Sequence, residues 1–128
     1  MQLNPLSSHA AHKRVNAYFE SCVAELMAAG FPEDQIFLDP GIGFGKTDAA
    51  NWSLLLNLTD YTRRYNVAIG ISRKGFIQRS FGAEAQESKD QLSKLIECQC
   101  VGHGASLIRT HNVKSLVSLS NIWQEALA

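Results

Sequence analysis

Polar side chains of complementary chemistry follow three short apolar segments of this 128-residue chain. Asp39 follows the first segment and Ser72-Arg73-Lys74 follows the second. Arg109 and His111 follow the third. A carboxylate accepts hydrogen bonds, whereas lysine and arginine donate them and carry positive charge. Such residues often only cap the next helix, but three strand ends in a row favour a ligand site. The ligand would combine a hydrogen-bond-donating edge with an anionic group.

The segment from Asp39 to Thr47 is rich in glycine and is similar in appearance to two nucleotide-binding motifs. It fails the phosphate-binding P-loop pattern because Pro40 stands where that pattern requires its first glycine. It fails the dinucleotide-binding fingerprint because Lys46 stands at the third glycine position. Glycine still lets the backbone approach a ligand closely or make a tight turn. Both roles stay open for Gly41, Gly43 and Gly45.

Length, charge and cysteine content limit the class of protein. The 12 basic and 12 acidic residues cancel, so bulk charge predicts no nucleic-acid partner. The apolar runs are too short for a membrane span, and residues 1–10 lack the basic and apolar regions of a signal peptide. No disulfide framework is predicted from Cys22, Cys98 and Cys100. We therefore expect a cytoplasmic protein.

The spacing of apolar residues predicts alternating helices and strands. Strands are predicted at 35–39, 67–71 and 105–109. Helices are predicted at 10–29, 48–65 and 76–81. Ser88 and Gln91 match a capping box, which predicts a further helix that ends at Gly102. Asn112 is the predicted N-cap of a last helix. One helix followed by three strand–helix units predicts an α/β fold with a parallel sheet. The whole chain, 1–128, is expected to form a single domain.

Three motifs of the chain together resemble the signatures of the dihydropteroate synthase family. They are Asp-Pro-Gly-Ile-Gly-Phe-Gly-Lys-Thr at 39–47, Ser-Arg-Lys at 72–74 and Arg-Thr-His-Asn-Val at 109–113, in the family's order. Segment 1–5 is also similar to the family. The resemblance implies an eight-stranded TIM (β/α)8 barrel. It further implies that this chain is truncated and supplies the C-terminal portion: about three parallel βα units, strands six to eight, plus the helix that precedes them.

The resemblance implies a transferase of folate biosynthesis. The family condenses 6-hydroxymethyl-7,8-dihydropterin pyrophosphate with para-aminobenzoate and releases dihydropteroate and pyrophosphate. By resemblance, Asp39 would accept hydrogen bonds from the pterin, and Lys74 would donate to another pterin edge. Arg109 would lie on the pterin face, and Arg109 with His111 would hold the departing pyrophosphate. Lys74, Arg109 and His111 are therefore the expected catalytic residues.

The resemblance places other residues beside the aminobenzoate. Gly43 and Phe44 would shape its pocket, and Arg73 would line it. Gly75 departs from the family because many members have serine there, and that hydroxyl could meet the aminobenzoate carboxylate. Asn112 departs as well, since family members often have aspartate, but both residues cap helices.

Magnesium is the cofactor that the resemblance implies, and its asparagine ligand belongs to the N-terminal half of the family's barrel. No metal ligand is predicted here because His9, His12 and His103 lack metal-binding spacing. Alone, the chain is expected to be inactive, and to bind a complementary N-terminal half or form a homodimer. Two alternatives stay open: a non-catalytic pterin-binding remnant, and a pterin-binding domain of the folate-dependent methyltransferase type.

Overall fold

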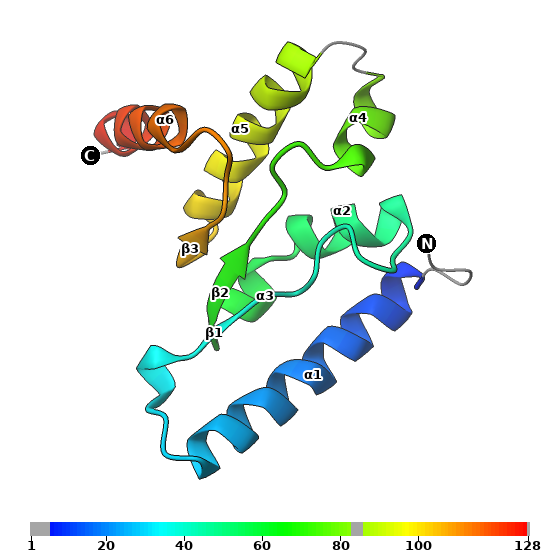
Figure 1. Cartoon of the computed structure of the whole chain (residues 1–128), viewed down its shortest axis with the longest axis vertical. Coiled ribbons are helices and arrows are strands. Elements are labelled where there is room, and N and C mark those ends of the chain that lie inside the picture. The colour runs from blue at the N-terminus through cyan, green and yellow to red at the C-terminus, as the bar shows by residue number, and fades with distance from the viewer. Residues whose placement is uncertain (1–5, 83–85, 128) are drawn as a thin grey trace.

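The computed structural model describes residues 6–82 and 86–127, without the side chains of 86–88 and 127. Segment 1–5, which contributes to the family resemblance, lies outside the described residues. The described part contains the strands β1 (Phe37–Leu38), β2 (Asn66–Ile69) and β3 (Leu107–Ile108). They pair in parallel in the order β1-β2-β3, with Leu38 opposite Val67 and Ile69 opposite Ile108 (Figure 1). The predicted parallel α/β arrangement is therefore confirmed.

Helices connect and flank these strands (Figure 1). The helix α1 (Ser8–Ala28) and the short 3-10 helix η1 (Glu33–Gln35) precede β1. The connection from β1 to β2 contains α2 (Asp48–Leu56) and α3 (Thr59–Thr62). The connection from β2 to β3 contains α4 (Gly75–Phe81) and α5 (Gln86–Gly102), and α6 (Val113–Leu127) follows β3. No helix in the described part of the chain is long and apolar enough to cross a membrane.

Side-chain caps mark the starts of the first and last helices. Ser7 Oγ accepts a hydrogen bond from Ala10 N (3.4 Å) before α1. Asn112 Oδ1 accepts one from Ser115 N (3.1 Å) before α6, so the predicted cap at Asn112 is confirmed. After α1, the chain turns at Gly30, whose φ of +99° favours glycine.

Two predicted helix boundaries are wrong. The helix expected at 48–65 breaks into α2 and α3 at Asn57. Asn57 Nδ2 donates to Ser53 O (2.8 Å), and such local side-chain hydrogen bonds compete with the regular helix. The capping box is also wrong, because α5 begins at Gln86 and contains Ser88.

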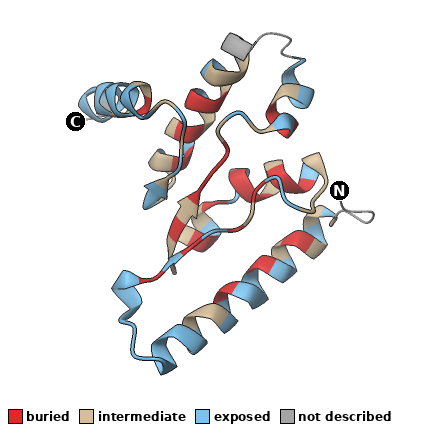
Figure 2. Cartoon of the chain, in the orientation of Figure 1, coloured by how far each residue is buried: buried red, intermediate tan, exposed pale blue. Residues whose placement is uncertain are grey.

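The core lies between the sheet and the helices α1, α2 and α3. Phe19 of α1 is fully buried and contacts the rings of Tyr61 and Tyr65 edge-on, at centroid distances of 5.7 Å and 5.3 Å. His12 of α1 contacts Tyr61 Oη through Nδ1 and Ser53 Oγ through Nε2, which fastens α1 to α2 and α3. Figure 2 shows the buried residues along the strands and the inner sides of these helices, whereas α6 is largely exposed.

The opposite face of the sheet is not covered by the described elements. Phe37 in β1 and Leu107 in β3 are each 48% exposed, although both are large apolar residues. Their neighbours along the strands, Leu38 and Ile108, point to the helix-covered face and are buried or partly buried. In a complete (β/α)8 barrel, side chains from all eight strands fill this inner face.

Candidate functional site

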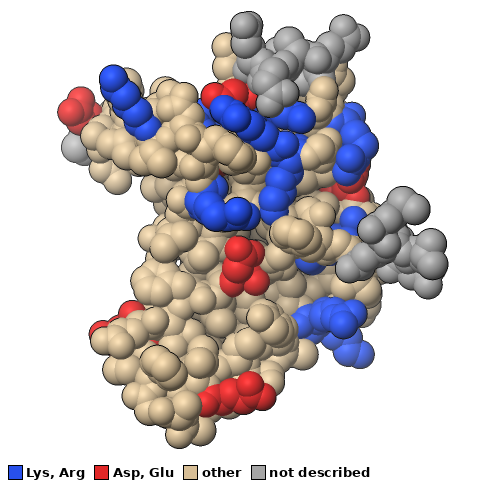
Figure 3. All heavy atoms as spheres, viewed as in Figure 1, with Lys and Arg blue, Asp and Glu red and all other residues tan. Residues whose placement is uncertain are grey.

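The carboxyl ends of β2 and β3 border a cavity of about 190 Å³. Three predicted site residues line it: Lys74, Arg109 and His111. Gly70, Ser72 and Thr110 complete the lining, and none of them was among the predicted site residues. Figure 3 shows Lys and Arg side chains gathered around the loops on this face of the molecule. A small cavity lined by cations and hydroxyl groups suits an anion.

Hydrogen bonds between the two loops hold this cavity together. Arg109 N donates to Ile69 O (2.8 Å), which continues the β2–β3 pairing up to the site. His111 N donates to Ser72 Oγ (3.2 Å), and His111 Nδ1 lies 2.7 Å from the same oxygen. Ser72 therefore orients the imidazole of His111 and leaves its Nε2 atom available for a ligand.

Gly70 lines the cavity and, because it has no side chain, leaves room for the side chain of Arg109. A Cβ atom at this position would lie within 3.3 Å of three atoms of the Arg109 guanidinium group. The guanidinium plane of Arg109 therefore lies across the end of β2 in space that only glycine leaves free. Sequence reasoning missed this role, although a glycine inside the predicted strand 67–71 could have indicated a close approach of another group.

The glycine-rich loop is closed by its own charged residues. Lys46 Nζ donates to Gly41 O (2.6 Å) and Phe44 O (2.9 Å). Asp39 Oδ1 accepts from Gly41 N (2.7 Å). Burial lowers the pKa of Lys46, while the charge of Asp39 acts in the opposite direction. The ammonium group of Lys46 thus binds carbonyl groups of its own loop, whereas the lysine of a P-loop binds phosphate.

Lys74 lies over the same loop from the β2 side. Its Nζ donates to Ile42 O and lies 4.5 Å from the centroid of the Phe44 ring. A Cβ atom at Gly43 would approach Lys74 Cδ to 2.9 Å, and the φ of Gly43 is +88°, so both the contact and the backbone favour glycine here. Burial lowers the pKa of Lys74, and the nearby Asp39 carboxylate partly offsets this effect.

Asp39 and Phe44 border a second hollow of about 470 Å³ between α1 and the glycine-rich loop. Phe44 is 65% exposed, and Tyr18 and Arg14 of α1 line the opposite side. Lys74 links the two hollows, because it lines the first and its Nζ lies over the ring of Phe44, which lines the second. The structure therefore places six predicted residues along these two hollows and at the contact between them: Asp39, Gly43, Phe44, Lys74, Arg109 and His111.

Arg73 is turned away from this region. Its Nε lies 3.3 Å from Asp90 Oδ1 of α5, and its backbone N donates to Ser93 Oγ (2.9 Å). Its φ of +58° lies in the left-handed region, which is unfavourable for a residue with a side chain. Arg73 therefore contacts α5 and does not line either hollow.

Metal-binding groups are not clustered in the described residues. No three His, Cys, Asp or Glu side chains among them lie close enough to hold an ion. His12 instead packs between helices through Tyr61 and Ser53.

Comparison with known proteins shows to which family this chain belongs. A family model described as pterin binding enzyme matches residues 1–111. The chain belongs to this family. A dihydropteroate synthase of Escherichia coli (strain K12) is 33% identical over 138 residues, and the match covers 100% of this chain and 48% of that protein. The resemblance to dihydropteroate synthases is confirmed.

Solved structures of the pterin binding enzyme family share this fold. The dihydropteroate synthase of Xanthomonas albilineans with 4-aminobenzoic acid matches 98% of this chain and 48% of its own, with a TM-score of 0.89 and 28% identity. The same enzyme in complex with 7,8-dihydropteroate matches 92% of this chain and 45% of its own, with a TM-score of 0.85 and 29% identity. The prediction of a partial TIM barrel is confirmed. The chain spans about half the length of these relatives.

Proposed function

We propose that this chain supplies one half of a dihydropteroate synthase site. The proposed reaction joins 6-hydroxymethyl-7,8-dihydropterin pyrophosphate to para-aminobenzoate and releases dihydropteroate and pyrophosphate. The convergence of Lys74, Arg109 and His111 on one cavity, beside Asp39 and the glycine-rich loop, carries this proposal. Such a set offers an acceptor for the donor edge of a pterin and cations for a pyrophosphate.

The pterin would lie between Asp39 and Lys74. One Asp39 oxygen accepts from Gly41 N (2.7 Å), so the carboxylate is oriented before a ligand arrives. Its remaining lone pairs would accept from the ring N–H and amino group of the pterin. Lys74 would exchange its hydrogen bond to Ile42 O for one to the pterin's other edge. The guanidinium of Arg109, placed flat by Gly70, would stack on the ring.

The pyrophosphate would occupy the cavity bordered by Arg109 and His111. In the reaction, the amine nitrogen of the aminobenzoate bonds to the pterin methylene carbon as that carbon's bond to the pyrophosphate oxygen breaks, and the amine then loses one proton to water. The leaving group gains negative charge as the bond breaks. Fixed donors at this position therefore stabilise the transition state more than the ground state. No protein nucleophile is required, so positioning and charge would supply most of the catalysis.

The aminobenzoate would lie against Phe44, on the open side of the glycine-rich loop. Phe44 is 65% exposed and already contacts Lys74, so its ring can form one wall of this pocket. Gly75 leaves the start of α4 without a hydroxyl group, and its Cβ position points toward Arg79 Nη1, 3.0 Å away. Arg73 would reach the aminobenzoate only by leaving Asp90, so we assign it a minor role.

Magnesium is the proposed cofactor, but the described residues do not fit a magnesium site of their own. They hold no cluster of three metal-binding side chains, and Asp39 is engaged by the loop. Magnesium commonly combines substrate phosphates with one or two protein ligands and water. The protein ligand is therefore proposed to lie outside this chain, and no step above depends on the metal.

Two partners are proposed for the chain. A complementary half of the barrel would cover the exposed inner face at Phe37 and Leu107.

The second proposed partner is another copy of this chain. This homodimer would form through an apolar hollow of about 470 Å³ between α5 and α6. Leu95, Ile122 and Trp123 line this hollow and are 52–63% exposed. In sedimentation equilibrium, Ile122→Asp should abolish a dimer formed this way, while Lys114→Asp should leave it intact.

Calorimetry tests the proposed function directly. The chain would be titrated with the pterin pyrophosphate in the presence of magnesium, beside a turnover assay with para-aminobenzoate. Binding without turnover is expected for the chain alone, and turnover is expected after the complementary half is added. Binding that never leads to turnover with that half would favour a non-catalytic pterin binder. Absence of binding in both preparations would refute the assignment of the site.

A further inference from the structure

The helix α5 carries a buried ion pair directly behind the cavity. Lys94 Nζ lies 2.8 Å from Glu97 Oε1, and the two side chains are only 5% and 0% exposed. Buried ion pairs often fail to recover the free energy that removing both charges from water requires. A protein in which apolar side chains replace such a pair is often as stable as the original or more stable. The pair therefore calls for an explanation other than stability.

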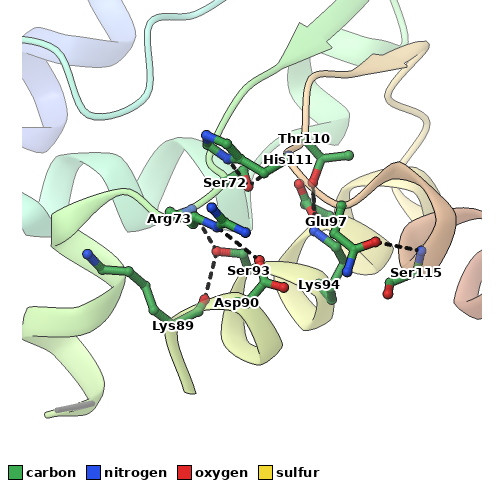
Figure 4. Close-up of polar contacts among 11 residues, drawn as sticks. Ser72, Arg73, Lys89, Asp90, Ser93, Lys94, Glu97, Thr110, His111 and Ser115 are labelled. Atoms are coloured by element: carbon green, nitrogen blue, oxygen red, sulfur yellow. Dashed lines mark hydrogen bonds and ion pairs between the residues drawn. The ribbon is translucent and has the colours of Figure 1, made fainter. Parts of the chain in front are cut away.

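Thr110 is the third member of this group (Figure 4). Lys94 Nζ donates to Thr110 Oγ1 (2.6 Å), and Thr110 Oγ1 donates to Glu97 Oε1 (3.1 Å). The three side chains form a closed triangle in which the hydroxyl group both accepts and donates. Thr110 stands between Arg109 and His111, so the triangle fixes the one residue that joins these two candidate ligand-binding residues.

The same helix also fixes the loop after β2. Ser93 Oγ accepts from Arg73 N (2.9 Å) and donates to Lys89 O (2.9 Å). Asp90 lies 3.3 Å from Arg73 Nε. These contacts hold Arg73 in its unfavourable backbone conformation, at φ +58°, immediately before Lys74. Successive turns of α5 thus contact both loops that border the cavity (Figure 4).

We propose that Lys94 and Glu97 are positioning residues, which act through Thr110 to hold Arg109 and His111 in the geometry that binds pyrophosphate. This proposal rests on the proposed function, because pyrophosphate is the ligand of that site. It differs from a purely structural role, in which the ion pair would stabilise α5 and have no effect on the ligand. Glu97 Oε2 has no hydrogen-bond partner among the described residues, so Thr110 and Lys94 alone direct this carboxylate.

Two sets of variants separate these roles. Lys94→Met/Glu97→Leu replaces the ion pair by apolar side chains of similar size, which should keep or raise the melting temperature. Thr110→Val removes the hydroxyl group at constant shape, whereas Thr110→Ser retains it. Lys114→Met is the charge control, because it removes an exposed cation close to the same loop without touching the triangle.

The variants are compared in two measurements on the whole chain. The first is calorimetric titration with inorganic pyrophosphate. The second is hydrogen exchange of the His111 amide, which donates to Ser72 Oγ and needs no ligand to report on the loop. The double variant and Thr110→Val should weaken pyrophosphate binding at least about tenfold and speed exchange by a similar factor, while both proteins stay folded. Lys114→Met should stay within about threefold of the parent chain in both measurements, and Thr110→Ser should retain more affinity and slower exchange than Thr110→Val does.

Unchanged affinity and exchange in a folded double variant would overturn the positioning role. The failure of the proposed function has a different signature. A parent chain that binds inorganic pyrophosphate but gains no affinity from the pterin would contradict the proposed substrate and leave the positioning role standing. With a parent chain that binds neither ligand, exchange at His111 decides the positioning role: faster exchange in both disruptive variants supports it, and unchanged exchange refutes it.

Discussion

Gly70 lies directly against the guanidinium group of Arg109, and a Cβ atom at Gly70 would lie 2.8 Å from Arg109 Nη2. Gly70→Ala should therefore displace Arg109 and weaken binding of the pterin pyrophosphate about tenfold, with little change in stability. Gly102→Ala is the matched control, since its Cβ atom would meet only Trp123 Nε1 at 3.9 Å. Calorimetry of the two variants checks this, and equal affinities would contradict the stacking role of Arg109.

Lys74 and Arg109 should matter most for catalysis. In a complete synthase that contains this chain, Lys74→Ala or Arg109→Ala should lower kcat/KM at least about a hundredfold, because fixed charge at the reacting groups is lost. Arg63→Ala is the control, because Arg63 lines a hollow with Glu33 and Asn66, at the opposite ends of the strands. Near-normal rates for both site variants would show that the site lies elsewhere.

Lys74 and Lys46 should lose their protons at lower pH than ordinary lysines. Burial is the main cause of the lowered pKa at both positions. In the window between the folded and unfolded pKa values, the unfolded chain binds more protons, so stability should rise with pH there. NMR titration of isotopically methylated lysines measures both values. Ordinary titration of both side chains would show that the glycine-rich loop is open to water in solution.

Phe19 should be a major source of stability because it is fully buried against Tyr61 and Tyr65. Phe19→Ala should lower the free energy of unfolding by about 3–5 kcal/mol. The adjacent Tyr18 is 57% exposed, so Tyr18→Ala should cost less than about 1 kcal/mol. Urea denaturation compares the two variants. Similar losses at both positions would mean that α1 is not packed as described.

The order and type of the main elements could be predicted from sequence because each depends on local patterns. Apolar periodicity located α1, α2, α5 and α6, and the cap at Asn112 marked the start of α6. The break at Asn57 was missed because the helical spacing of apolar residues, from Leu54 to Tyr61, continues through it. The side-chain hydrogen bond from Asn57 to Ser53 O marks the break in the structure. The strands are shorter than predicted, and Gln35, expected to begin the first strand, lies in the 3-10 helix η1 instead.

The candidate site was only partly accessible to sequence reasoning. Residues after each strand could be grouped because the carboxyl ends of parallel strands meet at one edge. The direction in which each side chain points could not be predicted in this way. Arg73 was therefore placed with the ligand, although it contacts Asp90 of α5. The triangle of Lys94, Glu97 and Thr110 was missed as well, because it joins positions 13–16 residues apart through tertiary packing.

The order β1-β2-β3 in the sheet repeats the order in which the strands leave the ribosome. Each new strand therefore pairs with one that has already been synthesised, and the hydrophobic core around Phe19 and Tyr61 can form before α5 exists. Arg109 and His111 follow α5 in the chain, so these two groups are synthesised after the helix that supports their loop, whereas Lys74 precedes it. Synthesis from the N-terminus thus makes the support of the β3 loop before the two charged groups that this loop carries.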